Sequence, residues 1–207
     1  AQPTVLFING NYWGIYNLRE RIDEYFVAKY SDAKKKDVTI IEDGMAELKE
    51  GSELEQESFK SMIDQINEMT EVSKDDVKWL KERIDLKSYM DYIFFETFYA
   101  NNDWPDNNAM CYKVNGEKWK WLLNDLDYSL AYPGAENINT NMFEKMSSSS
   151  SVHAAIFNKF ILNEKFKSDF VERCEKNFEE HLSDERINRK YNRIKEMYQS
   201  EMPNQID

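Results

Sequence analysis

A polar segment in the middle of the chain has the residue types and the spacing of a phosphoryl-transfer site. Asp103 is followed by Asn108 five residues later, and Asp125 comes after two strand-like segments. Where phosphate is transferred from ATP and Mg²⁺, one carboxylate accepts the proton of the attacking hydroxyl group, while an amide and a second carboxylate hold the metal. Oxygen ligands suit Mg²⁺, which neutralises the charge on the transferred group. This order of residues therefore predicts the acidic half of such a site.

Each of these side chains receives a predicted role. Asp103 is the predicted catalytic base or nucleophile-orienting carboxylate, and Asn108 is a predicted ligand of Mg²⁺ or Mn²⁺. Asp125 is placed first as the second metal ligand, although Asp127 could share the metal or be its main ligand. An ordinary polar turn is the alternative, because Asp, Asn and Pro are common between a helix and a hairpin. The ordered set of helix, loop, strand pair and Asp is a stronger signal than the Asp-Asn spacing by itself.

The elements on either side of this segment can be predicted from hydrophobic periodicity. After the cap residue Asp85, large apolar residues recur at helical spacing up to Phe98, so a core helix is expected to lead into the polar segment. Residues 110–114 and 119–123 are predicted strands joined by a turn, which places Asp125 just beyond a strand end.

The rest of the chain is predicted to combine short strands with amphipathic helices. Asn9-Gly10 between two apolar runs is a strong hairpin signal, because both residues tolerate positive φ. The predicted strands cover residues 4–8, 11–18 and 37–42. The predicted helices cover residues 19–28, 53–70, 74–84, 152–162, 164–182 and 184–202. Residues 44–52 are predicted to be a turn-rich, acidic insert, and residues 131–151 are a predicted loop. The serines that end this loop are interpreted as flexible loop, with phosphate acceptors as the alternative.

Composition limits the function classes. The 207 residues suffice for one domain or one and a half small ones, and the hydrophobic content of 41% argues against disorder. The net charge of −12 disfavours nucleic-acid binding, which selects Lys and Arg patches, and suits a basic protein partner. Solubility is the simpler explanation of this charge and stays open beside it. No apolar run approaches the ~18 residues of a membrane helix, so no membrane span is predicted.

The cysteines and histidines do not form a recognisable site. Cys111 and Cys174 are far apart and lack CxxC spacing, so no disulfide framework or zinc site is predicted. His153 and His181 have no companions at metal-ligand spacing, and we interpret both as ordinary helix residues.

Three segments resemble the CotH spore-coat kinase family, a group of atypical protein kinases. They are residues 7–23, residues 102–108, and residues 119–127 with the sequence WKWLLNDLD, and they occur in the family's order. The resemblance implies an α+β, atypical protein-kinase-like fold of short β-hairpins and a mainly helical C-terminal lobe. It also implies ATP-dependent phosphorylation of Ser or Thr in coat or surface proteins, at a spore surface or in another extracytoplasmic location.

The same resemblance divides the chain into two parts. Residues 1–22 would be the remnant of an N-terminal lobe sheet with the hinge, and residues 23–207 would be a helical C-terminal lobe. That lobe would contain a catalytic loop at 101–108 and a metal-binding strand end at 119–127.

Four side chains are predicted to contact the nucleotide. Tyr16, Trp119 or Trp121 could offer a ring to adenine, since stacking on a base is worth ~1–3 kcal/mol. Glu20 lies where the hinge is expected and could accept a hydrogen bond from the adenine amino group. Core packing of the three rings, and an ion pair of Glu20 with a neighbouring basic residue, are the alternatives.

The chain departs from ordinary protein kinases in this region. Asn101 and Asn102 replace the usual His and Arg before the catalytic Asp, Pro105 replaces a Lys, and no Gly follows Asp125-Leu126. No glycine-rich loop or phosphate-pairing Lys is recognisable. The chain is therefore expected to lack most of an N-terminal lobe and to be weak or inactive alone.

Two other functions remain as alternatives. A pseudokinase or assembly module would use the same fold to bind a partner without catalysis. A metal-dependent hydrolase would use Asp103, Asp125 and Asp127, because carboxylates on Mg²⁺ serve phosphoester cleavage equally well.

Overall fold

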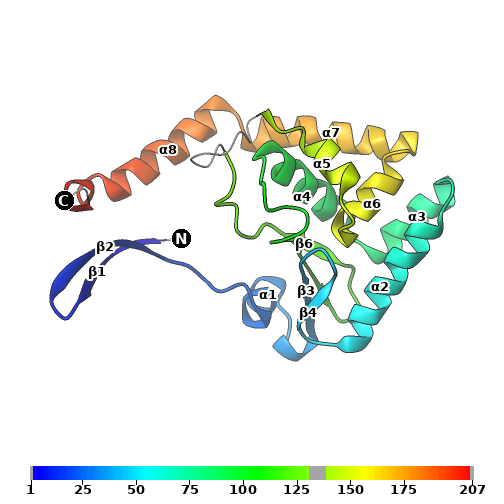
Figure 1. The fold of residues 1–207 in the computed structure, drawn as a ribbon, viewed down its shortest axis with the longest axis horizontal. Helices are drawn as coiled ribbons and strands as arrows, with labels where there is room; N and C mark the ends of the chain where they lie inside the picture. The colour runs from blue at the N-terminus through cyan, green and yellow to red at the C-terminus, as the bar shows by residue number, and fades with distance from the viewer. Residues whose placement is uncertain (1, 131–138, 206–207) are drawn as a thin grey trace. The chain divides into compact units, whose positions relative to one another are not determined.

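The computed structural model of the chain describes residues 2–130 and 139–205. Helices and small antiparallel sheets make up these residues, which confirms the predicted α+β class (Figure 1). Contacts divide the chain into a larger unit, residues 23–174, and a smaller unit, residues 1–22 with 175–207. The predicted C-terminal lobe included residues 175–207, whereas the contacts group these residues with residues 1–22. The functional roles of the predicted lobes stay predictions.

The larger unit contains a four-stranded antiparallel sheet with the strand order β4-β3-β5-β6. The strands are β3 (Val38–Glu42), β4 (Glu47–Glu50), β5 (Met110–Val114) and β6 (Lys120–Leu122). The apolar strand β3 is central and is buried apart from Glu42, as a short continuous apolar run indicates. The insert predicted as turn-rich at residues 44–52 begins with turns, but it also contains β4, which was not predicted. The sequence of β4, ELKE, has little apolar character, so its pairing with β3 determines the strand.

Three capped helices precede the polar segment. They are α2 (Glu53–Glu68), α3 (Lys74–Arg83) and α4 (Leu86–Phe98). Ser52, Ser73 and Asp85 each accept a hydrogen bond from an amide in the first turn that follows, which satisfies a donor that the helix leaves unpaired. These helices confirm the predictions made from periodicity. α2 packs against β3 and β4, while α4 packs against β6.

The outer edge of β6 is hydrogen-bonded to the chain around the start of α4. The amide of Trp121 donates to Oγ of Ser88 at 2.9 Å, and the same hydroxyl lies 3.4 Å from the carbonyl oxygen of that tryptophan. The amide of Trp119 donates to the Arg83 carbonyl at 3.0 Å, and the Asp85 amide donates to the Trp119 carbonyl at 2.8 Å. The strand that leads to the predicted metal site therefore has partners on both sides.

The C-terminal part of the larger unit is helical. It contains α5 (Met142–Ser148), α6 (Val152–Phe160) and the first residues of α7 (Glu164–His181). α6 packs against α2 and α5. The prediction of a loop over residues 131–151 is wrong for residues 142–148, which form α5. This helix is short, and Asn141 caps its start. The first eight residues of that loop, 131–138, lie outside the described residues.

The serine run is part of the structure and not a free loop. Its first two members belong to α5, Ser149 donates to Oδ1 of Asp106 at 2.7 Å, and buried Ser151 accepts a hydrogen bond from the His153 amide at the start of α6. The interpretation of these residues as a flexible loop is therefore wrong.

The first helix begins later than predicted. α1 covers Glu24–Ser31, because Asp23 caps it by accepting hydrogen bonds from two amides of its first turn. Residues 19–22 are therefore not helical, although the sequence predicted a helix over 19–28. A short 3₁₀ turn, η1 (Lys35–Asp37), then leads into β3.

The smaller unit contains a hairpin and the last helices. β1 (Gln2–Ile8) pairs with β2 (Asn11–Leu18) through Asn9 and Gly10, whose φ values of 53° and 82° confirm the predicted turn. α8 (Asp184–Tyr198) and α9 (Met202–Gln205) replace the single predicted helix at 184–202. Oε1 of Gln205 accepts a hydrogen bond from the Ile15 amide at 2.7 Å, so α9 is tied to β2.

The described residues include no helix that is long and apolar enough to cross a membrane. Cys111 lies fully buried on β5, and burial raises the pKa of its thiol well above the ordinary value. This cysteine packs in the core as a small apolar residue.

Candidate functional site

The predicted catalytic loop joins α4 to β5 in the larger unit. Nδ2 of Asn108 donates to Oδ2 of Asp103 at 3.3 Å, so the five-residue spacing brings these half-buried side chains together. Between them, Trp104 is fully buried and its Nε1 donates to the hydroxyl of Tyr92 on α4 at 2.8 Å. The loop is therefore anchored to the core at its centre, while the side chains of Asp103 and Asn108 stay partly accessible.

A buried asparagine connects this loop to the end of the strand pair. Oδ1 of Asn101 accepts a hydrogen bond from the Asp103 amide at 3.3 Å. Its Nδ2 donates to Oε2 of Glu96 at 2.9 Å and lies 3.5 Å from the carbonyl oxygen of Asp125. One side chain thus touches the backbone at both predicted acidic residues, and this explains how they are kept in one place.

Glu96 is a functional candidate that the sequence reasoning missed. Its side chain is fully buried, and burial raises its pKa to about 7, partly offset by the hydrogen bond from Asn101. Oε1 has no hydrogen-bond partner among the described residues, so the carboxyl group lies in an environment that favours its neutral form. The sequence did contain a signal that Glu96 is buried. It follows Tyr92 by four residues and Ile93 by three, which places it on the apolar face of α4.

The turn between β3 and β4 supports the loop from the other side. Oδ1 of Asp43 accepts a hydrogen bond from the Asn108 amide at 3.1 Å, and the Gly44 amide donates to the Asp106 carbonyl at 2.8 Å. A Cβ atom at Gly44 would lie 3.0 Å from that carbonyl oxygen, closer than most side chains pack. The turn and the loop therefore approach each other through their backbones.

His153 is a core residue that holds this turn in place. It is fully buried, and its Nδ1 accepts a hydrogen bond from Nε1 of Trp121 at 3.0 Å. Nε2 must then carry the proton, and it donates to the carbonyl oxygen of Asp43 at 3.2 Å. Burial lowers the pKa of this imidazole to about 4 despite that hydrogen bond. The neutral ring acts as a structural link, which agrees with the interpretation from the sequence.

A lysine reaches the loop from α5. Nζ of Lys145 donates to the carbonyl oxygen of Asn102, directly before Asp103. Burial lowers the pKa of this ammonium group, while the negative charges of Asp106 and Asp103 act in the opposite direction. The sequence reasoning missed this residue, because it lies in a segment that was predicted to be loop.

The predicted metal ligands are oxygen donors, and their role toward a metal ion stays a prediction. Asn108 and Asp125 both have positive φ, 59° and 49°, and offer oxygen atoms, which Mg²⁺ prefers. Within residues 2–130 and 139–205, no group of three His, Cys, Asp or Glu side chains is arranged to hold a metal by itself. Mg²⁺ bound with ATP needs only one or two protein carboxylates, since water and phosphates complete its coordination. Asp125 and Asp127 are both exposed, and their relative roles stay a prediction.

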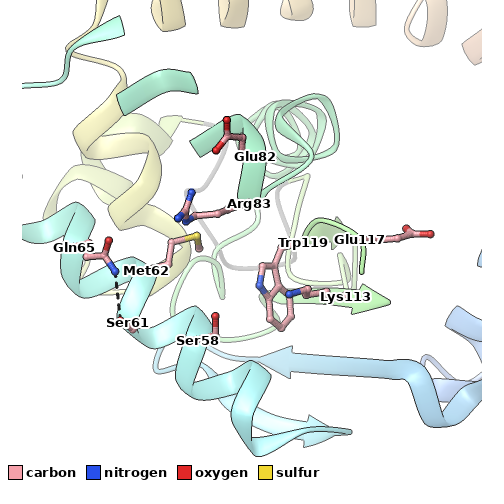
Figure 2. A pocket seen from close by; sticks show the side chains of 9 residues that line it. All are labelled: Ser58, Ser61, Met62, Gln65, Glu82, Arg83, Lys113, Glu117 and Trp119. Atoms are coloured by element: carbon pink, nitrogen blue, oxygen red, sulfur yellow. Dashed lines mark hydrogen bonds between the residues drawn. The ribbon is translucent and has the colours of Figure 1, made fainter. Parts of the chain in front are cut away.

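The two tryptophans predicted to stack on adenine lie in the core. Trp119 is 3% exposed and Trp121 is 6% exposed. Trp119 packs edge-on against Phe59, with ring centroids 4.9 Å apart, and borders a hollow of about 260 Å³ beside α2 and α3 (Figure 2). Trp121 packs edge-on against Tyr89, with ring centroids 4.7 Å apart. Because neighbouring rings surround both indoles, the alternative of core packing explains them, and the proposal below does not assign them to the nucleotide.

The other two predicted nucleotide contacts belong to the smaller unit. Tyr16 lies on β2 with 48% of its surface exposed, and Glu20 follows the same strand and is also exposed. Their roles toward adenine stay predictions.

Comparison with known protein families identifies the family of the chain. The family model described as CotH kinase protein matches residues 1–207. The chain belongs to the CotH kinase family. This membership confirms the resemblance seen in three segments and indicates a kinase-like function, a class that in general uses ATP and a divalent metal. No curated protein and no solved structure matches the chain.

Proposed function

We propose that this CotH kinase family member uses ATP and Mg²⁺ to phosphorylate Ser or Thr side chains of coat or surface proteins. The observation that carries the proposal is the hydrogen-bonded group of Asp103, Asn108 and Asn101, in which Asn101 also touches the backbone of Asp125. A base, an amide oxygen and a metal-binding carboxylate are what phosphoryl transfer requires on its acidic side.

Asp103 would act on the nucleophile. Asn108 donates to one of its carboxylate oxygens, which fixes the group and leaves the other oxygen for the substrate hydroxyl. As the hydroxyl oxygen attacks the γ-phosphorus and the bond to the bridging β-oxygen breaks, the carboxylate accepts the proton and ADP leaves. Mg²⁺, held by Asn108 and Asp125 or Asp127, would supply positive charge to the phosphates.

Nucleotide binding tests the proposal most directly. Calorimetry on this chain and on a protein extended at its N-terminus should show that the extended protein binds ATP in the presence of Mg²⁺ or Mn²⁺ and not in EDTA. Binding by the extended form alone would indicate that this chain is an incomplete part of an active enzyme. Asp125→Ala and Asp127→Ala should be compared, because the variant that loses metal-dependent binding identifies the main ligand. Loss in neither variant would contradict the assignment of the metal site.

The fate of the phosphate distinguishes the three candidate activities. With ATP labelled at the γ-position, a kinase transfers label to Ser or Thr of an added protein, and a basic substrate is the first choice because the chain carries a net charge of −12. Release of the label only to water would identify a hydrolase. No metal-dependent nucleotide binding by either form would contradict the kinase proposal and leave a binding module or a hydrolase that does not use ATP.

A further inference from the structure

The catalytic loop contains no positive charge of its own. Residues 99–112 include neither Lys nor Arg, and Pro105 stands two positions after Asp103. A phosphoryl group carries dispersed negative charge during transfer, and fixed cations placed against it are a main source of rate acceleration. Besides Mg²⁺, the proposed transfer would therefore need a protein cation from outside residues 99–112.

Lys145 is placed to meet this requirement. Its ammonium group donates to the carbonyl oxygen of Asn102, next to the proposed base, and the charges of Asp103 and Asp106 act on it. We propose that Lys145 binds the γ-phosphate of ATP and stabilises it during transfer. This inference rests on the proposed function and names a binding residue for that site.

The short helix α5 holds this lysine against the loop. Met142 and Met146, on either side of it in sequence, are buried, and Nδ2 of Asn158 on α6 donates to the Met146 carbonyl at 2.9 Å. Ser149, just after α5, donates to Oδ1 of Asp106 at 2.7 Å. Because the backbone is fixed on both sides of Lys145, its long side chain can exchange the Asn102 carbonyl for a phosphate oxygen without movement of the helix.

The environment of the ammonium group favours an anion. Burial removes water from it, and its hydrogen bond goes to a neutral carbonyl, so only the charges of Asp106 and Asp103 compensate it. A phosphate oxygen would add a negative charge opposite the ammonium group, which the neutral Asn102 carbonyl does not provide.

A purely structural role is the competing explanation, since Lys145 could serve only to hold Asn102. Lys145→Gln separates the two roles, because an amide can still donate to a carbonyl oxygen but carries no charge. Lys145→Arg keeps the charge. Lys159→Gln is the matched control: Lys159, on the neighbouring helix α6, also donates to backbone carbonyls, at 2.6 Å to Met69 and 3.3 Å to Asn67.

Calorimetry with Mg²⁺-ADP and with a non-hydrolysable Mg²⁺-ATP analogue tests the inference. Lys145→Gln should weaken binding of the analogue by about tenfold or more, the effect of one lost charged hydrogen bond, and leave ADP binding within about twofold. Lys145→Arg should retain preference for the analogue, and Lys159→Gln should match the wild type. The melting temperatures should be measured in parallel to show that each variant folds.

The outcomes separate this inference from the function on which it rests. If the wild type binds nucleotide and Lys145→Gln binds both ligands as the wild type does, the role of Lys145 is wrong while the kinase proposal stands. Equal loss of ADP and analogue binding indicates the structural role and also overturns the inference. If the wild type binds neither nucleotide, in this chain or in the extended protein, the proposed function fails together with it.

Discussion

At the scale of single residues, the predicted catalytic loop has polar side chains at its surface and is held from beneath by hydrogen bonds of buried side chains. Asp103 has one carboxylate oxygen held by Asn108 and its amide held by Asn101. The second oxygen has the accessibility that a catalytic base needs, because the side chain is half-buried and not enclosed.

Asp103→Asn should remove the base and preserve the fold, because the amide has the same shape. The rate of phosphoryl transfer should fall by about 10²–10⁴-fold, the usual contribution of a positioned base. ATP binding and the melting temperature should change little, since the proposed metal ligands are intact. A variant with a near-normal transfer rate would show that this carboxylate is not the base.

At the scale of elements, the turn between β3 and β4 is as important for the loop as α4 and β5, which flank it in sequence. Asp43 and Gly44 contact the loop through backbone and side-chain hydrogen bonds, and His153 fixes the turn from α6. The site is therefore assembled from segments that are more than 60 residues apart, as the separation of 65 positions between Asn108 and Asp43 shows.

Gly44→Ala should disturb this contact. Its Cβ would meet the carbonyl oxygen of Asp106 at 3.0 Å and Cα of Asp106 at 3.1 Å, and backbone atoms cannot turn aside as a flexible side chain can. We expect a loss of about 1–3 kcal/mol in the free energy of unfolding, typical of overpacking, together with weaker metal-dependent ATP binding.

Chemical denaturation and calorimetry would measure these two effects. Gly116→Ala is a useful comparison, since a Cβ there would meet nothing within 4 Å, although its positive φ of 80° adds backbone strain. Equal ATP affinity in Gly44→Ala and the wild type would show that the turn does not position the loop.

The elements with strong local signals could be predicted from the sequence, and those determined by tertiary contacts could not. The cap residue Asp85 and the apolar face after it predicted α4. The spacing of Asp103 and Asn108 predicted that their side chains come together. α5 was missed because its seven residues provide only one i, i+4 pair of buried apolar side chains, Met142 and Met146, and Lys145 was missed with it. Alternation grouped Trp119 and Trp121 correctly on one side of a strand, but only the packing shows that this side faces the core.

At the scale of the whole molecule, two buried titratable groups respond to pH in opposite directions. The pKa of His153 is lowered to about 4, so its neutral form stabilises the fold fully above the ordinary value of 6.5, and this contribution is lost as the pH falls toward 4. The pKa of Glu96 is raised from 4.5 to about 7, so its contribution is present below pH 4.5 and is lost as the pH rises through 7. Each amounts to about 3 kcal/mol, so the two largely offset each other between these limits.

Glu96→Gln should reveal this compensation, because the amide resembles the neutral carboxyl group at every pH. The variant should equal the wild type in the free energy of unfolding near pH 4.5 and exceed it by about 3 kcal/mol at pH 8. The phenol of Tyr92, which faces Glu96, does not titrate in this range because its pKa is raised well above the ordinary value of 10.

Urea denaturation at several pH values would measure the difference, with Glu57→Gln on the exposed side of α2 as the control for a lost surface charge. A difference between Glu96→Gln and the wild type that stays constant from pH 4.5 to 8 would contradict the burial effect. Together with the loss at low pH caused by His153, the variant should have a steeper dependence on acid than the wild type.

The serine at the edge of β6 has a consequence for association. Edge strands attract other strands because they present unpaired amide and carbonyl groups. Here the hydroxyl of Ser88 accepts the hydrogen bond of the Trp121 amide and lies close to the carbonyl oxygen of the same residue. A fifth strand would have to pair with these two groups. An extended segment of another molecule therefore cannot add to the sheet along this edge, which protects the strand leading to the acidic site from runaway self-assembly.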